Sequence, residues 1–253
     1  MFKKSIASFM MLAMVFGVSL TLCAQESDSY TMWESFMITP DNTKLQTLQE
    51  NMRNHNAKYH KEGPYKSTVY NIASGPNSGK IVWQMGPMMF SHNDTRPSDG
   101  GHDEDWRDNV MPYIKKMHSI EYWRQNDKLS NVSMVTDGGY PLLLIRYFEL
   151  EDGHGYSMND IFKKVSNTIK KMEGDNPWGL YYNEFLQGDL GRHVATVNFF
   201  KNWAELDEDG NFREVYEELH GENSWQSFTR SREDTFANEW HEIWVYNKEM
   251  SGD

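Results

Sequence analysis

The feature that most constrains the fold is an order of predicted elements that occurs twice along the 253-residue chain. In the first half, hydrophobic patterning predicts a strand at 30–38, a helix after Pro40, strands at 66–72 and 80–85, a helix over 106–120 and a strand at 131–135. In the second half it predicts a strand at 142–150, a helix capped by Ser157, strands at 180–186 and 193–200, helical pieces at 212–219 and 224–236, and a strand at 239–246. Both halves therefore have the order βαββαβ.

A shift of 112 residues superposes the two halves without gaps. Identical residues then coincide at Phe36 and Phe148, Tyr70-Asn71 and Tyr182-Asn183, Gly79 and Gly191, Val82 and Val194, and Glu121 and Glu233. Because these identities are few, the shared order of elements carries the interpretation. We interpret the chain as a tandem duplication, with one repeat at 30–137 and the other at 140–247.

Two βαββαβ units in one chain resemble the ferredoxin-like repeats of the dimeric α/β-barrel superfamily, over about residues 30–247. That group includes antibiotic-biosynthesis-type monooxygenases and NIPSNAP-like proteins. The resemblance rests on element order and on no sequence motif. It implies an α+β fold in which two four-stranded sheets pack face to face within one chain, with the helices outside. The same fold hosts cofactorless oxygenases, haem enzymes and proteins with no known reaction, so it does not define a function.

Charge and cysteine content exclude several classes of function. The chain has 25 basic and 37 acidic residues, a formal net charge of -12. This acidity argues against nucleic-acid binding. The single cysteine excludes an intrachain disulfide framework and a thiolate-rich zinc site.

The N-terminus has the pattern of an export signal. Lys3 and Lys4 precede an apolar run over 6–22, and a polar segment follows Ala24. We expect residues 1–24 to be a signal peptide, the mature protein to be periplasmic or extracellular, and no transmembrane span to remain. The alternative is a lipid anchor on Cys23, since the four residues that end there resemble a lipoprotein box, although Leu22 stands where that box has a small residue.

Strand alternation gives the candidate binding residues. In the first half we expect Ile81, Trp83 and Met85 to face the helices and the alternate residues to face the partner sheet. In the second half we assign Thr196 and its alternate neighbours to the cavity between the sheets. Glu34 aligns with Arg146 in the repeat, and the two could instead form a buried salt bridge or lie at an open edge. The predicted ligand-binding residues are Glu34, Asn71, Gln84, Arg146, Asn183 and Thr196.

No metal site or cofactor is expected. His55 belongs to the buried stripe of the first helix and is expected to be a hydrogen-bonded core histidine, whereas His60 should point elsewhere. No His-x-x-x-His metal arrangement lies on one predicted helix. The acidic loop at 207–211 resembles a calcium loop but has Phe212 at its sixth position, where that loop needs glycine. The sequence also has no glycine-rich phosphate loop or nucleophile elbow.

Three functions remain open. The first is an exported protein that binds a small, partly apolar ligand between its sheets. The second is a cofactorless monooxygenase with Arg146 as the anion stabiliser and with Glu34 or a strand histidine as the base. His193 and His241 are those histidines, and they reach the cavity only if the assignment of strand faces is reversed. The third is an envelope protein-interaction module with an acidic surface. The sequence leaves the oligomeric state open.

Overall fold

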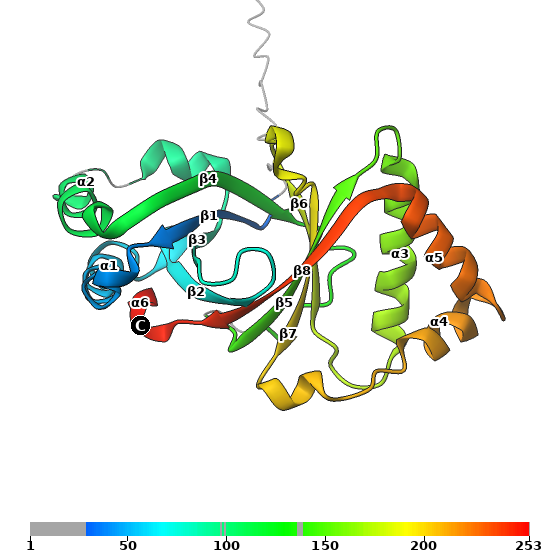
Figure 1. The fold of residues 1–253 in the computed structure, drawn as a ribbon. Helices are drawn as coiled ribbons and strands as arrows, with labels where there is room; N and C mark the ends of the chain where they lie inside the picture. The colour runs from blue at the N-terminus through cyan, green and yellow to red at the C-terminus, as the bar shows by residue number, and fades with distance from the viewer. Residues whose placement is uncertain (1–28, 97, 99, 136–138, 253) are drawn as a thin grey trace, which may run out of the picture.

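A computed structural model of the protein describes residues 29–96, 98, 100–135 and 139–252. Its eight strands form one closed antiparallel barrel with the order β1-β3-β2-β8-β5-β7-β6-β4 (Figure 1). The strands are β1 (Met32–Pro40), β2 (Ser67–Ser74), β3 (Ile81–Met88), β4 (Ile114–Gln125), β5 (Leu142–Leu150), β6 (Trp178–Asn183), β7 (Val194–Phe200) and β8 (Phe236–Tyr246). Each half therefore contributes four adjacent strands, and the halves join where β2 pairs with β8 and where β4 pairs with β6.

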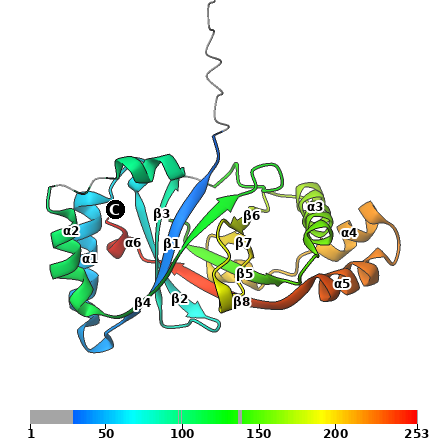
Figure 2. The same ribbon diagram turned by 90° about the horizontal axis from the view of Figure 1, so that it is seen from above.

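The helices lie on two opposite sides of the barrel. Figure 2 shows α1 (Leu45–Tyr59) and α2 (His102–Asp105) on the side of the first half, and α3 (Gly155–Lys171), α4 (Phe212–His220) and α5 (Ser224–Thr235) on the side of the second. The short C-terminal helix α6 (Lys248–Ser251) returns to the first half, where the Asn56 side chain donates a hydrogen bond to the Met250 carbonyl at 2.6 Å. This confirms the prediction of two βαββαβ repeats with the helices outside an intrachain barrel.

Three groups of buried side chains hold these layers together. Two of them lie between a half of the sheet and its own helices, and they are centred on Trp83 and on Phe148. The third fills part of the barrel interior with residues from both halves, among them Met37, Tyr147 and Trp244. The two repeats thus share one core and cannot bury it separately.

The predicted end of the first repeat is wrong. Instead of a helix over 106–120 and a strand at 131–135, the chain forms one π-helical turn at Trp106–Val110, a short 3-10 turn at Met111–Tyr113 and then β4. Pro112 has no backbone N–H and prevents the helix from continuing. Beyond it, the backbone pairs with β1 on one side and with β6 on the other, which outweighs the helical spacing of the apolar residues.

Two smaller predictions also need correction. Glu121 lies on β4 but Glu233 lies in α5, so their coincidence in the repeat alignment is accidental. Ser157 does not cap its helix, because α3 begins two residues earlier at Gly155, and no side chain in this described segment caps it.

The predicted signal peptide and Cys23 lie outside the described residues. None of the helices in the described part of the chain is long and apolar enough to cross a membrane.

Candidate functional site

An open-ended cavity lies inside the barrel between its two halves, and we call it the barrel cavity. It has a volume of about 550 Å³. Both repeats contribute aromatic side chains to its wall: Trp33, Tyr70, Trp123, Tyr140, Tyr147, Tyr181, Phe199 and Trp244. A volume of this size with an apolar lining and a few polar groups is typical of small-molecule binding sites.

The polar groups of the barrel cavity come mostly from the first half. They are Thr31, Lys66, Thr68, Gln84 and Gln125, and the described lining includes no carboxylate and no histidine. Burial raises the pKa of Tyr70, Tyr147 and Tyr181, so their phenol groups stay protonated near neutral pH. The lining can therefore hydrogen-bond a ligand but offers no general base at neutral pH.

The same lining does not fit haem, which the superfamily resemblance allows. The described lining residues provide no histidine, cysteine or methionine to bind haem iron, and the raised pKa values of the buried tyrosines disfavour tyrosinate ligands.

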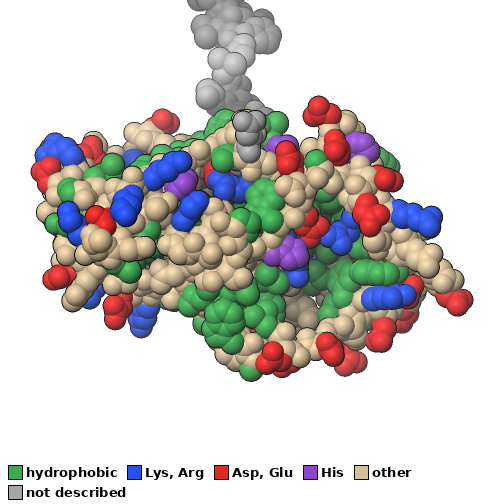
Figure 3. All heavy atoms as spheres, in the orientation of Figure 1, with side chains coloured by type: hydrophobic (Ala, Val, Ile, Leu, Met, Phe, Trp, Pro, Cys, Tyr) green, Lys and Arg blue, Asp and Glu red, His purple; other side chains and the backbone are tan. Residues whose placement is uncertain are grey.

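A second hollow lies between the second half of the sheet and helices α3, α4 and α5. We call it the outer groove, and its volume is about 1010 Å³. In Figure 3 the surface is hollowed between the barrel and these helices, with hydrophobic side chains around the opening. Apolar walls that include Phe162 and Trp225 face a floor of polar strand residues, namely Arg146, Thr196 and Asn198.

Arg146 is the distinctive residue of the outer groove. It is half-buried, and its guanidinium donates a hydrogen bond to the Asn198 side-chain oxygen at 2.5 Å. Among the described residues, no carboxylate lies within ion-pair distance of Arg146. Burial lowers the pKa of Arg146, and the nearby Glu239 opposes this shift. A half-buried cation with a neutral partner favours an anionic group at Arg146 itself. The rest of the groove lining carries five carboxylates, namely Glu173, Asp175, Glu205, Glu208 and Asp209.

Strand register places other polar groups beside Arg146. Arg146 pairs with Thr196 on β7 and with His241 on β8, so the three side chains share one face of the sheet. The His241 ring donates a hydrogen bond from Nε2 to the Glu239 carboxylate at 2.9 Å, and Glu239 also pairs with Arg232. This face therefore combines a cation with a histidine–carboxylate pair.

The six predicted ligand-binding residues do not lie in one place. Gln84 lines the barrel cavity, and Arg146 and Thr196 line the outer groove. Asn71 is exposed and accepts a hydrogen bond from Asn247 at 3.5 Å, and Asn183 donates to the Arg192 carbonyl at 3.1 Å. The structure therefore divides the predicted residues between the barrel cavity, the outer groove and positions outside both.

Glu34 forms no pair with Arg146. It is 2% exposed on the helix side of the first half, where it accepts two hydrogen bonds from the Arg96 guanidinium at 3.0 and 3.2 Å and a third from Tyr122 at 3.1 Å. The suggested Glu34–Arg146 salt bridge is therefore wrong.

The predicted faces are right on β3 but reversed elsewhere: Glu34 on β1 and Asn71 on β2 share the helix-facing side of their strands, and the faces of the second half are reversed as well. Ile81, Trp83 and Met85 pack toward the helices as expected. On β7, however, Ala195 and Val197 line the barrel cavity, and Thr196 faces the outer groove. The error arose because we took the more apolar set for the helix-facing one, whereas the barrel interior is itself apolar and aromatic.

The histidine predictions have mixed outcomes. His55 is a buried, hydrogen-bonded core residue as expected, with Nδ1 2.7 Å from the Asp105 carboxylate. His60 does not point elsewhere: it is 4% exposed and its ring lies 5.3 Å from that of His55. His193 accepts a hydrogen bond from the Leu150 backbone N–H at 3.0 Å, which makes its role structural.

The aromatic lining of the barrel cavity was missed as a binding surface. Its residues alternate along their strands like any buried set, so no single strand distinguishes them from core residues. Only the closure of the barrel brings Trp123 of the first half near Tyr147 of the second, with ring centroids 5.7 Å apart.

Comparison with known proteins supports the fold assignment. No protein-family model matches the sequence, and no curated protein matches it. Among solved structures, the chain is similar to a candidate monooxygenase from Fusobacterium nucleatum subsp. nucleatum, with a TM-score of 0.58, 8% identity, and coverage of 87% of this chain and 94% of that one. A candidate monooxygenase from Lactobacillus acidophilus gives a TM-score of 0.52 at 8% identity, over 86% of this chain and 94% of that one.

A mutant chlorite dismutase from Candidatus Nitrospira defluvii is similar to the same extent. Its TM-score is 0.52 at 6% identity, over 88% of this chain and 94% of that one. At such low identities the likeness concerns the fold alone. The chain therefore has the dimeric α/β-barrel fold, with both ferredoxin-like units in a single polypeptide.

Proposed function

We propose that the protein binds a small, partly apolar molecule inside the barrel, between its two four-stranded sheets. The observation that carries this proposal is the barrel cavity of about 550 Å³ with an aromatic wall. Its polar residues, among them Lys66, Gln84 and Gln125, favour a ligand with an aromatic or alicyclic body and one polar end.

Two neighbouring positions on β7 provide a matched test. Ala195→Leu adds a side chain inside the barrel cavity, and Thr196→Leu makes a comparable change on the groove side. With 8-anilinonaphthalene-1-sulfonate as the fluorescent probe, we expect Ala195→Leu to weaken binding by about tenfold, equivalent to about 1.4 kcal/mol. Thr196→Leu should leave it unchanged.

Circular dichroism melting checks that both variants are folded. Equal probe binding by the two variants and the unmodified protein would contradict binding in the barrel cavity. Binding lost only in Thr196→Leu would move the site to the outer groove.

A specific observation favours a second function, a cofactorless monooxygenase-type activity in the outer groove. His241 lies beside Arg146 in the strand register and bonds to Glu239. In this scheme His241 removes a proton from an activated CH2 group of a phenolic substrate, and Arg146 stabilises the resulting anion. The deprotonated carbon bonds to dioxygen to give a hydroperoxide, which loses water and leaves a carbonyl group. One oxygen atom thus enters the product, the other leaves as water, and the CH2 carbon supplies all four electrons.

Oxygen consumption distinguishes an enzyme from a binding protein. The unmodified protein and the His241→Gln, Arg146→Met and Gln84→Leu variants are incubated with a panel of polyphenols in an oxygen-electrode cell. Turnover in the groove predicts loss of oxygen uptake in the first two variants and its retention in Gln84→Leu. No uptake with any substrate, together with probe binding in the barrel cavity, would favour the binding function.

Export is part of the proposal and rests on the sequence of residues 1–24. Intact mass spectrometry of the protein from a bacterial host's periplasm or medium tests it. A mass that begins at Gln25 supports cleavage after Ala24, and a diacylated Cys23 supports the lipid anchor. A full-length chain retained in the cytoplasm would contradict both.

A further inference from the structure

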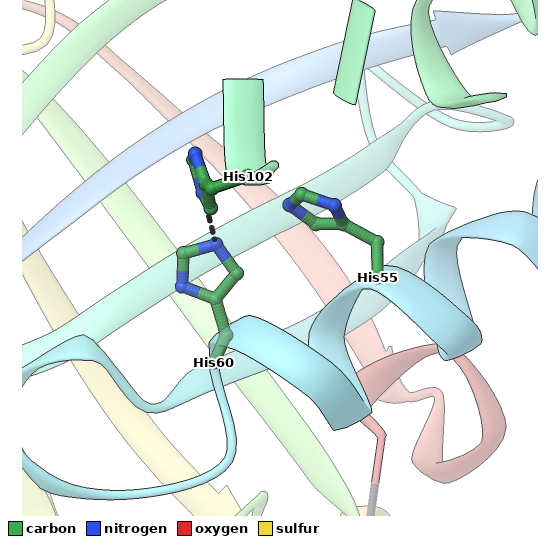
Figure 4. Close-up of side chains that lie close together, drawn as sticks. All are labelled: His55, His60 and His102. Carbon is green, nitrogen blue, oxygen red and sulfur yellow. Dashed lines mark hydrogen bonds between the residues drawn. The ribbon is translucent and has the colours of Figure 1, made fainter. Parts of the chain in front are cut away.

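Three histidines meet on the outer side of the first half, away from both hollows. His55 lies on α1, His60 follows directly after that helix, and His102 begins α2 (Figure 4). One nitrogen of each ring lies within 4.8 Å of the corresponding nitrogens of the other two. His55 is 1% exposed and His60 is 4% exposed, so two of the rings are removed from solvent.

The hydrogen bonds of the rings define which nitrogen carries the proton. His55 Nδ1 lies 2.7 Å from the Asp105 carboxylate, His60 Nδ1 lies 3.0 Å from the Tyr65 carbonyl, and His102 Nδ1 lies 2.7 Å from the Asp103 carboxylate. At neutral pH these partners are acceptors only, so each Nδ1 is the donor. In the neutral rings, each Nε2 therefore presents a lone pair to the centre of the cluster.

This arrangement leaves the three Nε2 atoms without suitable partners within the described structure. His60 Nε2 and His102 Nε2 face each other at 3.1 Å, which opposes two lone pairs when both rings are neutral. His55 Nε2 is buried and has no hydrogen-bond partner among the described residues.

We propose that His55, His60 and His102 bind a zinc-type divalent metal ion through their Nε2 atoms, with a water molecule in the fourth position. Nitrogen atoms that share a tetrahedral zinc ion lie about 3.4 Å apart, close to the separation between His60 and His102. Three imidazoles suit zinc and its neighbouring transition metals better than magnesium or calcium.

The surroundings have the features of a metal site. Asp105 and Asp103 accept from the remaining nitrogens of two ligands, as carboxylates do behind many zinc-bound histidines. Asp105 is itself held by a hydrogen bond from the Asn109 side chain at 2.8 Å. Trp83 and Trp106 form apolar walls, with ring centroids 5.0 Å from His60 and 5.1 Å from His55.

The open side of the site lies at His102. Its side chain is 15% exposed and that of Asp103 is 70% exposed, so water and a small ligand can approach from there. Three protein ligands and one exchangeable position are the arrangement of catalytic zinc sites, in which the metal lowers the pKa of bound water. The ion would also tie α2 to α1.

Metal titration of the full, tag-free chain tests the proposal. After treatment with EDTA and buffer exchange, isothermal titration calorimetry with Zn²⁺ should give one bound ion per chain. His102→Ala, at the most exposed ligand, should weaken binding by more than about 100-fold, and Asp105→Asn by about 10- to 100-fold. His154→Ala, which changes a histidine of the second half, should bind like the unmodified protein.

Cobalt substitution gives a readout that does not depend on the variants. Co²⁺ bound to three imidazoles and one water should give the intense visible absorption of a tetrahedral ion, and His102→Ala should abolish it. The absence of stoichiometric Zn²⁺ binding, a weak octahedral cobalt spectrum, or equal affinity in His102→Ala and His154→Ala would each overturn the proposal.

Discussion

The outer layers of the two halves differ although both cover the same kind of four-stranded sheet. In the first half, Trp83 stacks on Phe36 with ring centroids 5.1 Å apart and donates a hydrogen bond to Asn56 of α1 at 3.1 Å. Helix α6 adds the fully buried Met250 to this layer. In the second half, α3, α4 and α5 leave the outer groove open above Arg146.

This difference between the two outer layers shows that the same βαββαβ unit can carry two kinds of polar site. The closed layer of the first half contains a cluster of three histidines among aromatic rings, whereas the open layer of the second contains a cation and a histidine–carboxylate pair. The segment that precedes the last strand of each half contributes to this difference between the outer layers. It runs over 89–113 in the first half and over 201–235 in the second, where it is long enough for two helices.

The largest effect is expected where the halves depend on each other. Arg192, 7% exposed before β7, forms a buried ion pair with Glu121 of β4, and its Nε lies 3.1 Å from a carboxylate oxygen. Arg192→Met should cost about 3–5 kcal/mol, because it leaves a buried carboxylate unpaired. Urea unfolding measures this cost. The double variant with Glu121→Leu should recover most of it, and a loss below about 1 kcal/mol for Arg192→Met alone would contradict this view of the junction.

Metal binding should stabilise the first half by a smaller amount. At a free Zn²⁺ concentration 100 times the dissociation constant, we expect about 2.7 kcal/mol more stability, because the ion binds only the folded cluster of His55, His60 and His102. Urea unfolding of EDTA-treated protein with and without Zn²⁺ measures the change. The increment should vanish in His102→Ala and persist in Arg146→Met, and the reverse result would place the metal in the second half.

Arg146→Met should change stability much less than Arg192→Met. Arg146 has a neutral hydrogen-bond partner, Asn198, so its removal leaves no buried carboxylate behind. We expect a change within about 1 kcal/mol of zero in urea unfolding. A loss as large as that of Arg192→Met would indicate a structural role for Arg146 and would weaken the interpretation of Arg146 as an anion site.

The smallest effects are expected before the first helix of each half. Neither α1 nor α3 has a side-chain cap, but a short 3-10 turn at Asn42–Lys44, capped by Asp41, precedes α1. The hydroxyl and backbone N–H of Thr43 hydrogen-bond to Asp41 and lower its pKa, whereas His154 at the start of α3 provides no side-chain cap. Asp41→Asn should therefore lower the melting temperature slightly at neutral pH. The loss should disappear as the pH falls through the lowered pKa, because the Asp41 carboxylate is then protonated.

The converse change is predicted for the second half. His154→Asp should add about 0.5–1 kcal/mol by capping α3. Differential scanning calorimetry compares this variant with Asp41→Asn. A lower melting temperature for His154→Asp would show that the geometry before Gly155 does not admit a cap.

Much of the fold follows from local sequence patterns. The alternation on β3 and the apolar stripe of α3, which includes Ile161 and Ile169, predict these elements and their buried sides. The repeated order βαββαβ then predicts the barrel. The site was harder to predict: Gln84 was assigned correctly to the barrel cavity, but Thr196 was assigned to the wrong face because both faces of β7 are mostly buried.

The sequence by itself determined the tandem repeat, the element order and the core stripes, because these depend on neighbours within one helix or strand. Only the tertiary structure decided that residues 114–125 form β4, since their pairing partners lie on β1 and β6. It also brought His102 to His55 and His60, which no local spacing relates. Contacts between residues far apart in the chain depend on how the strands close into a barrel and on how the loops pack against the helices. Hydrophobic periodicity reflects only neighbours within one helix or strand, so it does not predict these contacts.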